Sequence, residues 1–124
     1  MKVRIRAESA EVEAEIYENT KAGKLIAEAL PIEGRVNRWG DEIYFAIPVR
    51  MEEFPDAKSD VEVGDLGYWP PGSAFCIFFG PTPVSTGNKP RAYSPVNLFG
   101  RVIGDATVLR KVKDGEKIVV EKIE

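Results

Sequence analysis

The sequence predicts one domain spanning residues 1–124, mainly β, in which a closed and mostly antiparallel β-barrel carries two helices. Three observations predict this fold. Apolar residues recur at every second position in most segments, which is the period of strands with one buried face. Two segments have the period of a helix instead. The first and last segments both read as strands, and closing the sheet on itself would give each of them a partner.

The chain begins with a predicted β-hairpin. Apolar and charged residues alternate through residues 2–7 and again through 11–16, with a turn near Ser9-Ala10. We expect a register in which paired residue numbers sum to 19, because it aligns the apolar faces and sets Arg4 opposite Glu15 and Arg6 opposite Glu13. Exposed ion pairs of this kind contribute only about 0.2 to 1 kcal/mol each.

The next segment predicts a helix from Thr20 to Leu30. Pro31 ends it, Asn19 or Thr20 is the N-cap, and the apolar stripe consists of Ala22, Leu25, Ile26, Ala29 and Leu30. Beyond it we expect a short strand at Val36, a turn over 37–41 that carries Trp39, and a strand over 43–47 that Pro48 ends. Residues 52–63 are polar and read as a surface connection.

The longest apolar run, residues 73–79, predicts the central strand. Phe75, Ile77 and Phe79 alternate with Ala74, Cys76 and Phe78, so neither face of this strand is polar. Such a strand is either buried on both faces, most simply beneath the chain's own helix, or it forms the floor of a pocket.

The last third predicts a flexible loop, a strand, a helix and a final strand. The loop from Pro81 to Pro95 is unusually long and is expected to be the least protected segment. A strand follows over 96–103. The second helix is capped by Asp105, with Val108, Leu109 and Val112 facing inward, and residues 117–123 form the closing strand.

Composition excludes several kinds of site chemistry. The chain has no histidine and one cysteine, so it has no imidazole base, no internal disulfide and no soft-metal cluster. We expect no metal and no cofactor, because the glutamates at 11, 13 and 15 read as a solvated strand face. A net charge of −3 argues against nucleic-acid and anionic-membrane partners.

The sequence also predicts where the protein resides. Its N-terminal residues alternate from the start and form neither an apolar span nor a secretory leader, so we expect a cytoplasmic protein. Glutamate and lysine lead among the charged residues, which make up 30% of the chain, a balance seen in thermophile proteins.

Several segments resemble a known family. Residues 72–77, Gly-Ser-Ala-Phe-Cys-Ile, are similar to a cyclophilin strand, and residues 96–102 with the helix after them resemble the family's Val-Val-Phe-Gly-Lys-Val strand and closing helix. The longer strings at 40–45, 64–72 and 78–83 resemble a small prokaryotic cyclophilin-like family of unsettled function. The resemblance implies the cyclophilin barrel. It also implies peptidyl-prolyl isomerisation, in which an arginine hydrogen-bonds the proline carbonyl beside a hydrophobic pocket.

The family's functional positions are only partly kept. Its pocket glutamine and phenylalanine fall on Ala74 and Cys76, its loop tryptophan falls near Arg91, and its pocket histidine falls on Val96. The catalytic arginine matches Arg35, and Arg38 is an equally reachable candidate. Each of these arginines can also be an ordinary surface residue.

Two functional hypotheses and one structural alternative follow. The first is a site for a proline-containing peptide, with weak isomerase activity from Arg35 or Arg38 and with walls formed by Tyr44, Trp69, Ala74, Cys76, Phe78 and Tyr93. The second is a non-catalytic module that uses the same concave face for another small ligand or for a partner subunit, so an oligomer is possible. The alternative treats Cys76 as a buried small hydrophobe and the aromatic residues as core filling.

Overall fold

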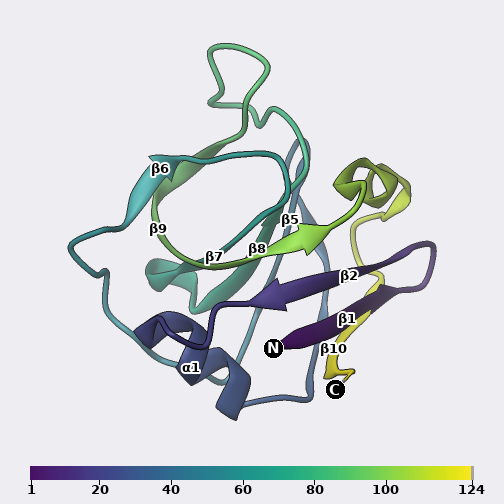
Figure 1. Ribbon diagram of the computed structural model, residues 1–124. Helices are drawn as coiled ribbons and strands as arrows, with labels where there is room; N and C mark the ends of the chain where they lie inside the picture. Colours follow the sequence, from purple (N-terminus) through teal and green to yellow (C-terminus); the bar gives the residue numbers. More distant parts are fainter. Residues whose placement is uncertain (124) are drawn as a thin grey trace.

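The computed structural model describes residues 1–123, which form a mainly antiparallel β domain (Figure 1). The one α-helix in this range is α1, Lys21–Glu28, and the 3-10 helices are η1, Pro70–Gly72, and η2, Ala106–Lys111. In chain order the strands are β1 Lys2–Ala7, β2 Glu11–Ile16, β3 Ile32–Arg35, β4 Asn37–Arg38, β5 Glu42–Ala46, β6 Lys58–Asp60, β7 Asp65–Trp69, β8 Ala74–Phe78, β9 Arg91–Ile103 and β10 Lys117–Lys122.

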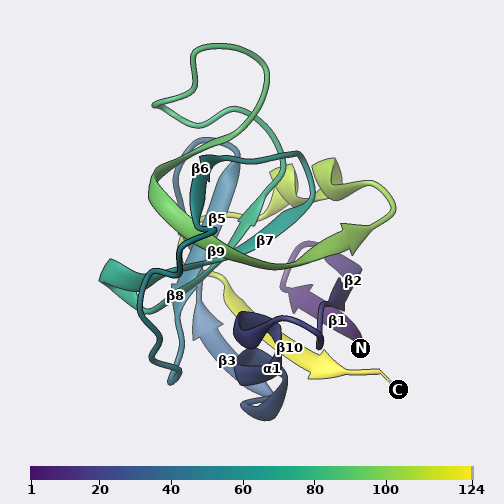
Figure 2. The ribbon, with the colours of Figure 1, turned by 60° about the vertical axis from the view of Figure 1, so that its left-hand side comes forward.

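The strands pair in the order β3-β10-β1-β2-β9-β7-β8-β5-β4, and β6 pairs with β9 beside this path. The path is open, because no ladder between described residues joins β3 to β4, so the predicted closure into a ring is not confirmed. The two end strands are nevertheless neighbours in the chain, separated only by Val36. In both views α1 lies at one end of the curved sheet, and the loop between β8 and β9 extends from the opposite end (Figures 1 and 2).

Both predicted helices are present, although one has a different form. Helix α1 begins after Thr20, whose hydroxyl oxygen accepts a hydrogen bond from the Gly23 N–H, as expected of an N-cap. The second is a 3-10 helix rather than an α-helix. Asp105 caps it as predicted, by accepting from the Thr107 N–H at 2.9 Å. None of the helices in residues 1–123 is long and apolar enough to span a membrane.

The N-terminal hairpin forms, but its predicted register is wrong by two residues. Val3 lies opposite Ala14 and Arg4 opposite Glu13, so paired numbers sum to 17 instead of 19. The turn is therefore centred on Glu8-Ser9, where the Ala7 N–H donates to the Ala10 carbonyl at 2.9 Å. A shift of two residues keeps every side chain on its face, so the alternation of apolar and charged residues does not distinguish the two registers.

The predicted ion pairs change with the register. Arg4 pairs with Glu11 at 3.5 Å, and Arg6 reaches across to Glu121 of β10 at 3.1 Å. The turn is set by a distant contact: Ser9 donates hydrogen bonds to Glu116 from its backbone N–H at 3.0 Å and from its hydroxyl at 2.7 Å. Because Glu116 is far away in the sequence, the local pattern carries no information about this anchor.

Strand β9 is much longer than the predicted strand that began at Val96. It starts at Arg91, so the predicted loop from Pro81 to Pro95 is too long, and its last five residues belong to the sheet. Pro95 has no N–H to donate, and it lies where the pairing of β6 with β9 shifts its register. Four strands were not predicted: β3, β7, β4, which lies in the predicted turn over 37–41, and β6, which lies in the predicted surface connection. The strand expected at Val36 is absent, because Val36 is the single residue between β3 and β4.

Strand β8 is buried at every position and separates two apolar clusters. Phe75 and Ile77 face the main core, which also holds Ile26 of α1. The opposite face presents Ala74, Cys76 and Phe78 to a smaller cluster, here called the second cluster, which also contains Val61, Ala92 and Val96. Helix α1 thus covers only one face. The chain around β6 and the first half of β9 cover the other.

We expect hydrogen exchange to be fastest in residues 86–89 and slowest in β8. Residues 86–89 are all exposed, whereas every residue of β8 is buried and the strand pairs with β5 on one side and β7 on the other. Amide exchange followed by NMR tests this, with residues 91–94 as an internal comparison because they belong to β9. Slower exchange at 86–89 than at 74–78 would contradict the assignment.

Candidate functional site

A pocket of about 170 Å³ opens over the second cluster. Its walls come from the β4–β5 hairpin, the end of β7 and the first half of β9, and it is lined by Trp39, Glu42, Tyr44, Trp69, Ala92, Tyr93 and Val96. We call it the aromatic pocket. Four of the seven lining residues are aromatic, and one is an acid.

The four rings form a continuous series of edge-to-face contacts. Tyr93 lies 6.1 Å from both Trp39 and Trp69, and Tyr44 lies 6.4 Å from Trp69, with interplanar angles of 70° to 88°. In this geometry the positive edge of one ring meets the negative face of the next. The Trp69 indole N–H donates to the Ser94 hydroxyl at 2.6 Å, which fixes its orientation. Tyr93 is 72% exposed and therefore forms the rim.

Glu42 is the acidic group of the pocket, and it is only 5% exposed. Burial raises the pKa of its carboxyl from 4.5 to about 7, and a hydrogen bond with the Cys76 thiol partly opposes that rise. Burial, together with the neighbouring Glu42, raises the pKa of the Cys76 thiol well above its usual value. Cys76 is therefore a neutral thiol beneath the carboxyl and is unsuited to act as a nucleophile.

The turn between β4 and β5 places Trp39 and Glu42 on the same wall. Their backbones exchange two hydrogen bonds, at 2.9 and 3.2 Å, across the two intervening residues. Gly40 adopts φ +61, and a Cβ there would lie 2.8 Å from a side-chain carbon of Pro83. Glycine therefore suits this position both for its conformation and for its size.

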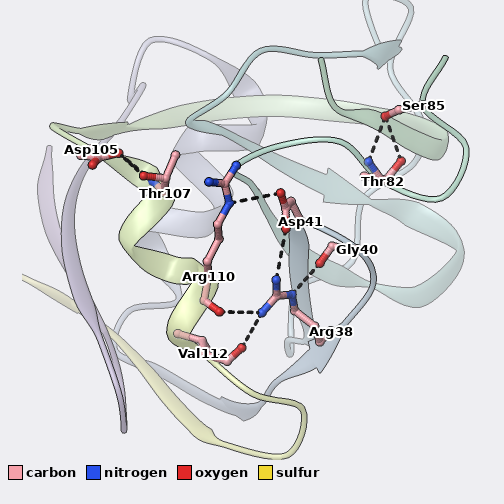
Figure 3. Close-up of polar contacts among 9 residues, drawn as sticks. All are labelled: Arg38, Gly40, Asp41, Thr82, Ser85, Asp105, Thr107, Arg110 and Val112. Atoms are coloured by element: carbon pink, nitrogen blue, oxygen red, sulfur yellow. Dashed lines mark hydrogen bonds and ion pairs between the residues drawn. The ribbon is translucent and has the colours of Figure 1, made fainter. Parts of the chain in front are cut away.

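Arg38 anchors this turn to η2 (Figure 3). Its guanidinium donates to the carbonyls of Gly40, Arg110 and Val112, the last two at 3.1 and 2.8 Å. It also pairs with Asp41 at 3.1 Å, while Arg110 contacts the other oxygen of the same carboxylate at 3.3 Å. In Figure 3, Asp41 lies between the two arginines. We call these contacts the arginine clamp.

The structure brings together only some of the predicted site residues. Tyr44, Trp69 and Tyr93 line the aromatic pocket, and Ala74, Cys76 and Phe78 lie beneath it in the second cluster. Neither predicted arginine lines it. Arg38 belongs to the clamp, and Arg35 is exposed at the end of β3, where it donates to the Gly115 carbonyl at 3.3 Å. A catalytic role for either arginine stays a prediction.

Sequence reasoning missed Glu42 as a member of the site and treated Trp39 as core filling. One signal was available for Glu42. It lies two residues before Tyr44 on β5, so both side chains point to the same face of the sheet, away from Ile43 and Phe45. A carboxyl that shares a face of a largely apolar strand with a predicted pocket residue indicates a buried acid. No comparable signal marks Ala92, which was placed in a loop.

Comparison with known proteins identifies the family. The model of the cyclophilin-like family matches residues 1–121. The chain belongs to this family. A hypothetical protein from Archaeoglobus fulgidus, solved in solution, is 49% identical and superposes with a TM-score of 0.81, covering 98% of this chain and 93% of its own. None of the curated proteins matches the chain. The resemblance to a small prokaryotic cyclophilin-like family is thus confirmed.

The described residues were also considered as metal ligands. Within residues 1–123 no group of three or more histidine, cysteine, aspartate or glutamate side chains is placed to hold a metal ion. The aromatic pocket offers a ligand the ring faces of its aromatic residues, the hydroxyls of Tyr44 and Tyr93, and the carboxyl of Glu42.

We expect Glu42 to make the protein less stable as the pH rises. The folded state keeps the Glu42 proton between about pH 4.5 and 7, where the unfolded chain has lost it, so the free energy of unfolding falls across this range. The difference corresponds to about 3 kcal/mol. Urea unfolding of wild type and Glu42→Gln at pH 5 and pH 8 measures it. An equal decline in both proteins would contradict the assignment.

We expect Arg38→Ala to destabilise the fold by about 2 to 3 kcal/mol, because it leaves three carbonyls and one oxygen of the Asp41 carboxylate without their donor. Arg35→Ala is the matched control. It removes one long, exposed hydrogen bond and should change stability by less than about 0.5 kcal/mol. Chemical denaturation measures the free energy of unfolding of both variants. Equal decreases in the two variants would contradict a stabilising role of the clamp.

Proposed function

We propose that this chain is a binding module for a small ligand and that its site is the aromatic pocket. The proposal rests on the composition of the pocket walls, in which four aromatic rings border a space beside one buried carboxyl. Concave, mostly apolar sites with a few convergent polar groups are the usual form of ligand pockets. The Glu42 carboxyl, whose raised pKa results from burial, supports the same choice.

The contacts of the two arginines favour binding over isomerisation. An isomerase of the cyclophilin type needs a donor for the proline carbonyl beside the bound ring. Arg38 directs its guanidinium at its own chain, and Arg35 lies outside the pocket. A proline-containing peptide stays a candidate ligand, because flat rings pack well against a pyrrolidine, but its isomerisation would lack that donor. A partner subunit at the exposed rim, Tyr93, is a second form of the same binding role.

The two tryptophans make the proposed function measurable. The chain contains two, Trp39 and Trp69, and both line the aromatic pocket, so intrinsic fluorescence reports directly on its occupancy. We expect a panel of small ligands and proline peptides to include members that change this fluorescence saturably. Tyr93→Ala should weaken their affinity about tenfold, because one wall of the pocket is removed.

The control for this measurement is Ile103→Ala. Ile103 is an exposed apolar residue on the same strand and does not line the pocket. It should leave the affinity unchanged. Equal affinity of Tyr93→Ala and wild type, or ligand-induced NMR shifts that map away from the pocket, would refute the proposed site.

We expect prolyl isomerase activity well below that of a typical cyclophilin. The positions that seat the proline in the family are Ala74, Cys76 and Val96, and no arginine or lysine lines the pocket within the described residues. A peptide isomerisation assay on wild type, Arg35→Ala and Arg38→Ala measures this. A cyclophilin-like rate in wild type that either substitution abolishes would restore the catalytic hypothesis.

A further inference from the structure

We propose that the aromatic pocket binds a small organic cation, of the methylated ammonium class, and that the Glu42 carboxylate is its counter-ion. This inference rests on the proposed function and names the chemistry of its ligand. It depends on three features of the described residues: the ring series, the position of Glu42 and the absence of any cation from the pocket walls.

The ring series supplies the first attraction. Trp39, Tyr44, Trp69 and Tyr93 all border one space, and their mutual edge-to-face packing holds them in place around it. The face of an aromatic ring carries partial negative charge, and tryptophan attracts cations most strongly. Cages of this type recognise quaternary and methylated ammonium groups. Ala92 and Val96 line the same space and offer apolar contact to methyl groups.

Glu42 supplies the second attraction. None of the ion pairs between described residues includes it, and no lysine or arginine lines the pocket with it. Both arginines of the clamp are already paired with Asp41, and Arg91 at the start of β9 pairs with Asp60. The negative charge of an ionised Glu42 is therefore available to a ligand.

Neutral ligands fit this wall less well. A proline ring could lie against the aromatic faces, but it would leave the buried carboxyl beside an apolar group, with its charged form unsolvated. A primary ammonium is strongly hydrated and needs three acceptors to replace its water. The polar groups of the pocket are one carboxyl and the hydroxyls of Tyr44 and Tyr93, and its remaining walls are ring faces and the apolar side chains of Ala92 and Val96, which replace none of that water. A methylated ammonium needs fewer acceptors and exposes methyl groups, which suits the remaining wall.

The binding of a cation should depend on pH. The titratable groups that face Glu42 are the Cys76 thiol from β8, the Tyr44 phenol from its own strand and the Tyr93 phenol from β9. Since the pKa of Glu42 is about 7 in the empty pocket, cation binding at lower pH requires loss of its proton. The affinity should therefore fall as the pH drops, by up to about 100-fold between pH 8 and pH 5.

The test compares a cation with its neutral isostere. Choline chloride and 3,3-dimethylbutan-1-ol have the same shape, but only choline is charged. Both are titrated at pH 8 and constant ionic strength, together with an Ala-Pro model peptide, and read by tryptophan fluorescence and by NMR shifts. We expect choline to bind saturably and at least about tenfold more tightly than the alcohol.

Glu42→Gln isolates the counter-ion, since it keeps the shape of the side chain and removes its charge. It should weaken choline binding at least about tenfold, while the affinity for the alcohol stays the same or rises because the unsolvated charge is gone. Glu28→Gln is the matched control, because Glu28 is an exposed glutamate of α1 outside the pocket. Thermal unfolding verifies that each variant is folded.

The outcomes separate this inference from the proposed function. If the alcohol or the peptide binds as tightly as choline, or if Glu42→Gln binds choline normally, the cation proposal is overturned while the pocket keeps its binding role. If choline, the alcohol, the peptide and a wider fragment panel all leave both tryptophans unperturbed, the cation proposal and the proposed function fail together. Saturable choline binding that is lost in Glu42→Gln and at pH 5 supports both.

Discussion

The fold depends on covering both faces of β8. This strand has no polar side chain on either side, so each face must be buried by other parts of the chain or exposed at a cost of about 25 cal/mol per Å² of apolar surface. The main core covers Phe75 and Ile77 completely. The opposite face is buried by a smaller cluster, which includes Val61 and residues of the first half of β9, and above it lies the aromatic pocket. The site thus lies over the smaller of the two clusters that bury the central strand.

The sequence predicted the elements better than their pairing. The period of the apolar residues located α1, β8 and β10 and the hairpin strands, because burial on one face imposes that period directly. The register failed at Ser9, whose turn is held by Glu116, the residue before β10. The extent of β9 was missed because Pro95 ordinarily ends a strand, whereas here it occupies an irregularity in the β6–β9 ladder. Both errors arise from contacts between segments distant in sequence.

The site was predicted in part, for similar reasons. Tyr44, Trp69 and Tyr93 were identified because aromatic walls suit the proline ring of the expected peptide ligand. The resemblance to cyclophilins directed attention to Arg35 and Arg38. A family motif transfers residue types but not their contacts, and neither arginine lines the pocket. Glu42 has no counterpart in that reasoning. Its phase with Tyr44 marks it as a buried acid, but its contact with the Cys76 thiol follows only from the pairing of β5 with β8.

Ionisation of the buried Glu42 carboxyl destabilises the folded state, whereas the contacts of the arginine clamp stabilise it. An ionised Glu42 in an apolar wall disfavours the folded state at neutral pH, and a neutral residue of the same size would avoid that cost. The turn that carries Glu42 is nevertheless held on one side by Arg38. On the other side it is held by the hydrogen bond that the Phe79 N–H donates to the Asp41 carbonyl. Because the clamp fixes the turn independently, the backbone of Glu42 stays where its side chain lies on the buried face of β5. A costly group held in place by strong, separate contacts is the arrangement expected where a side chain serves binding rather than stability.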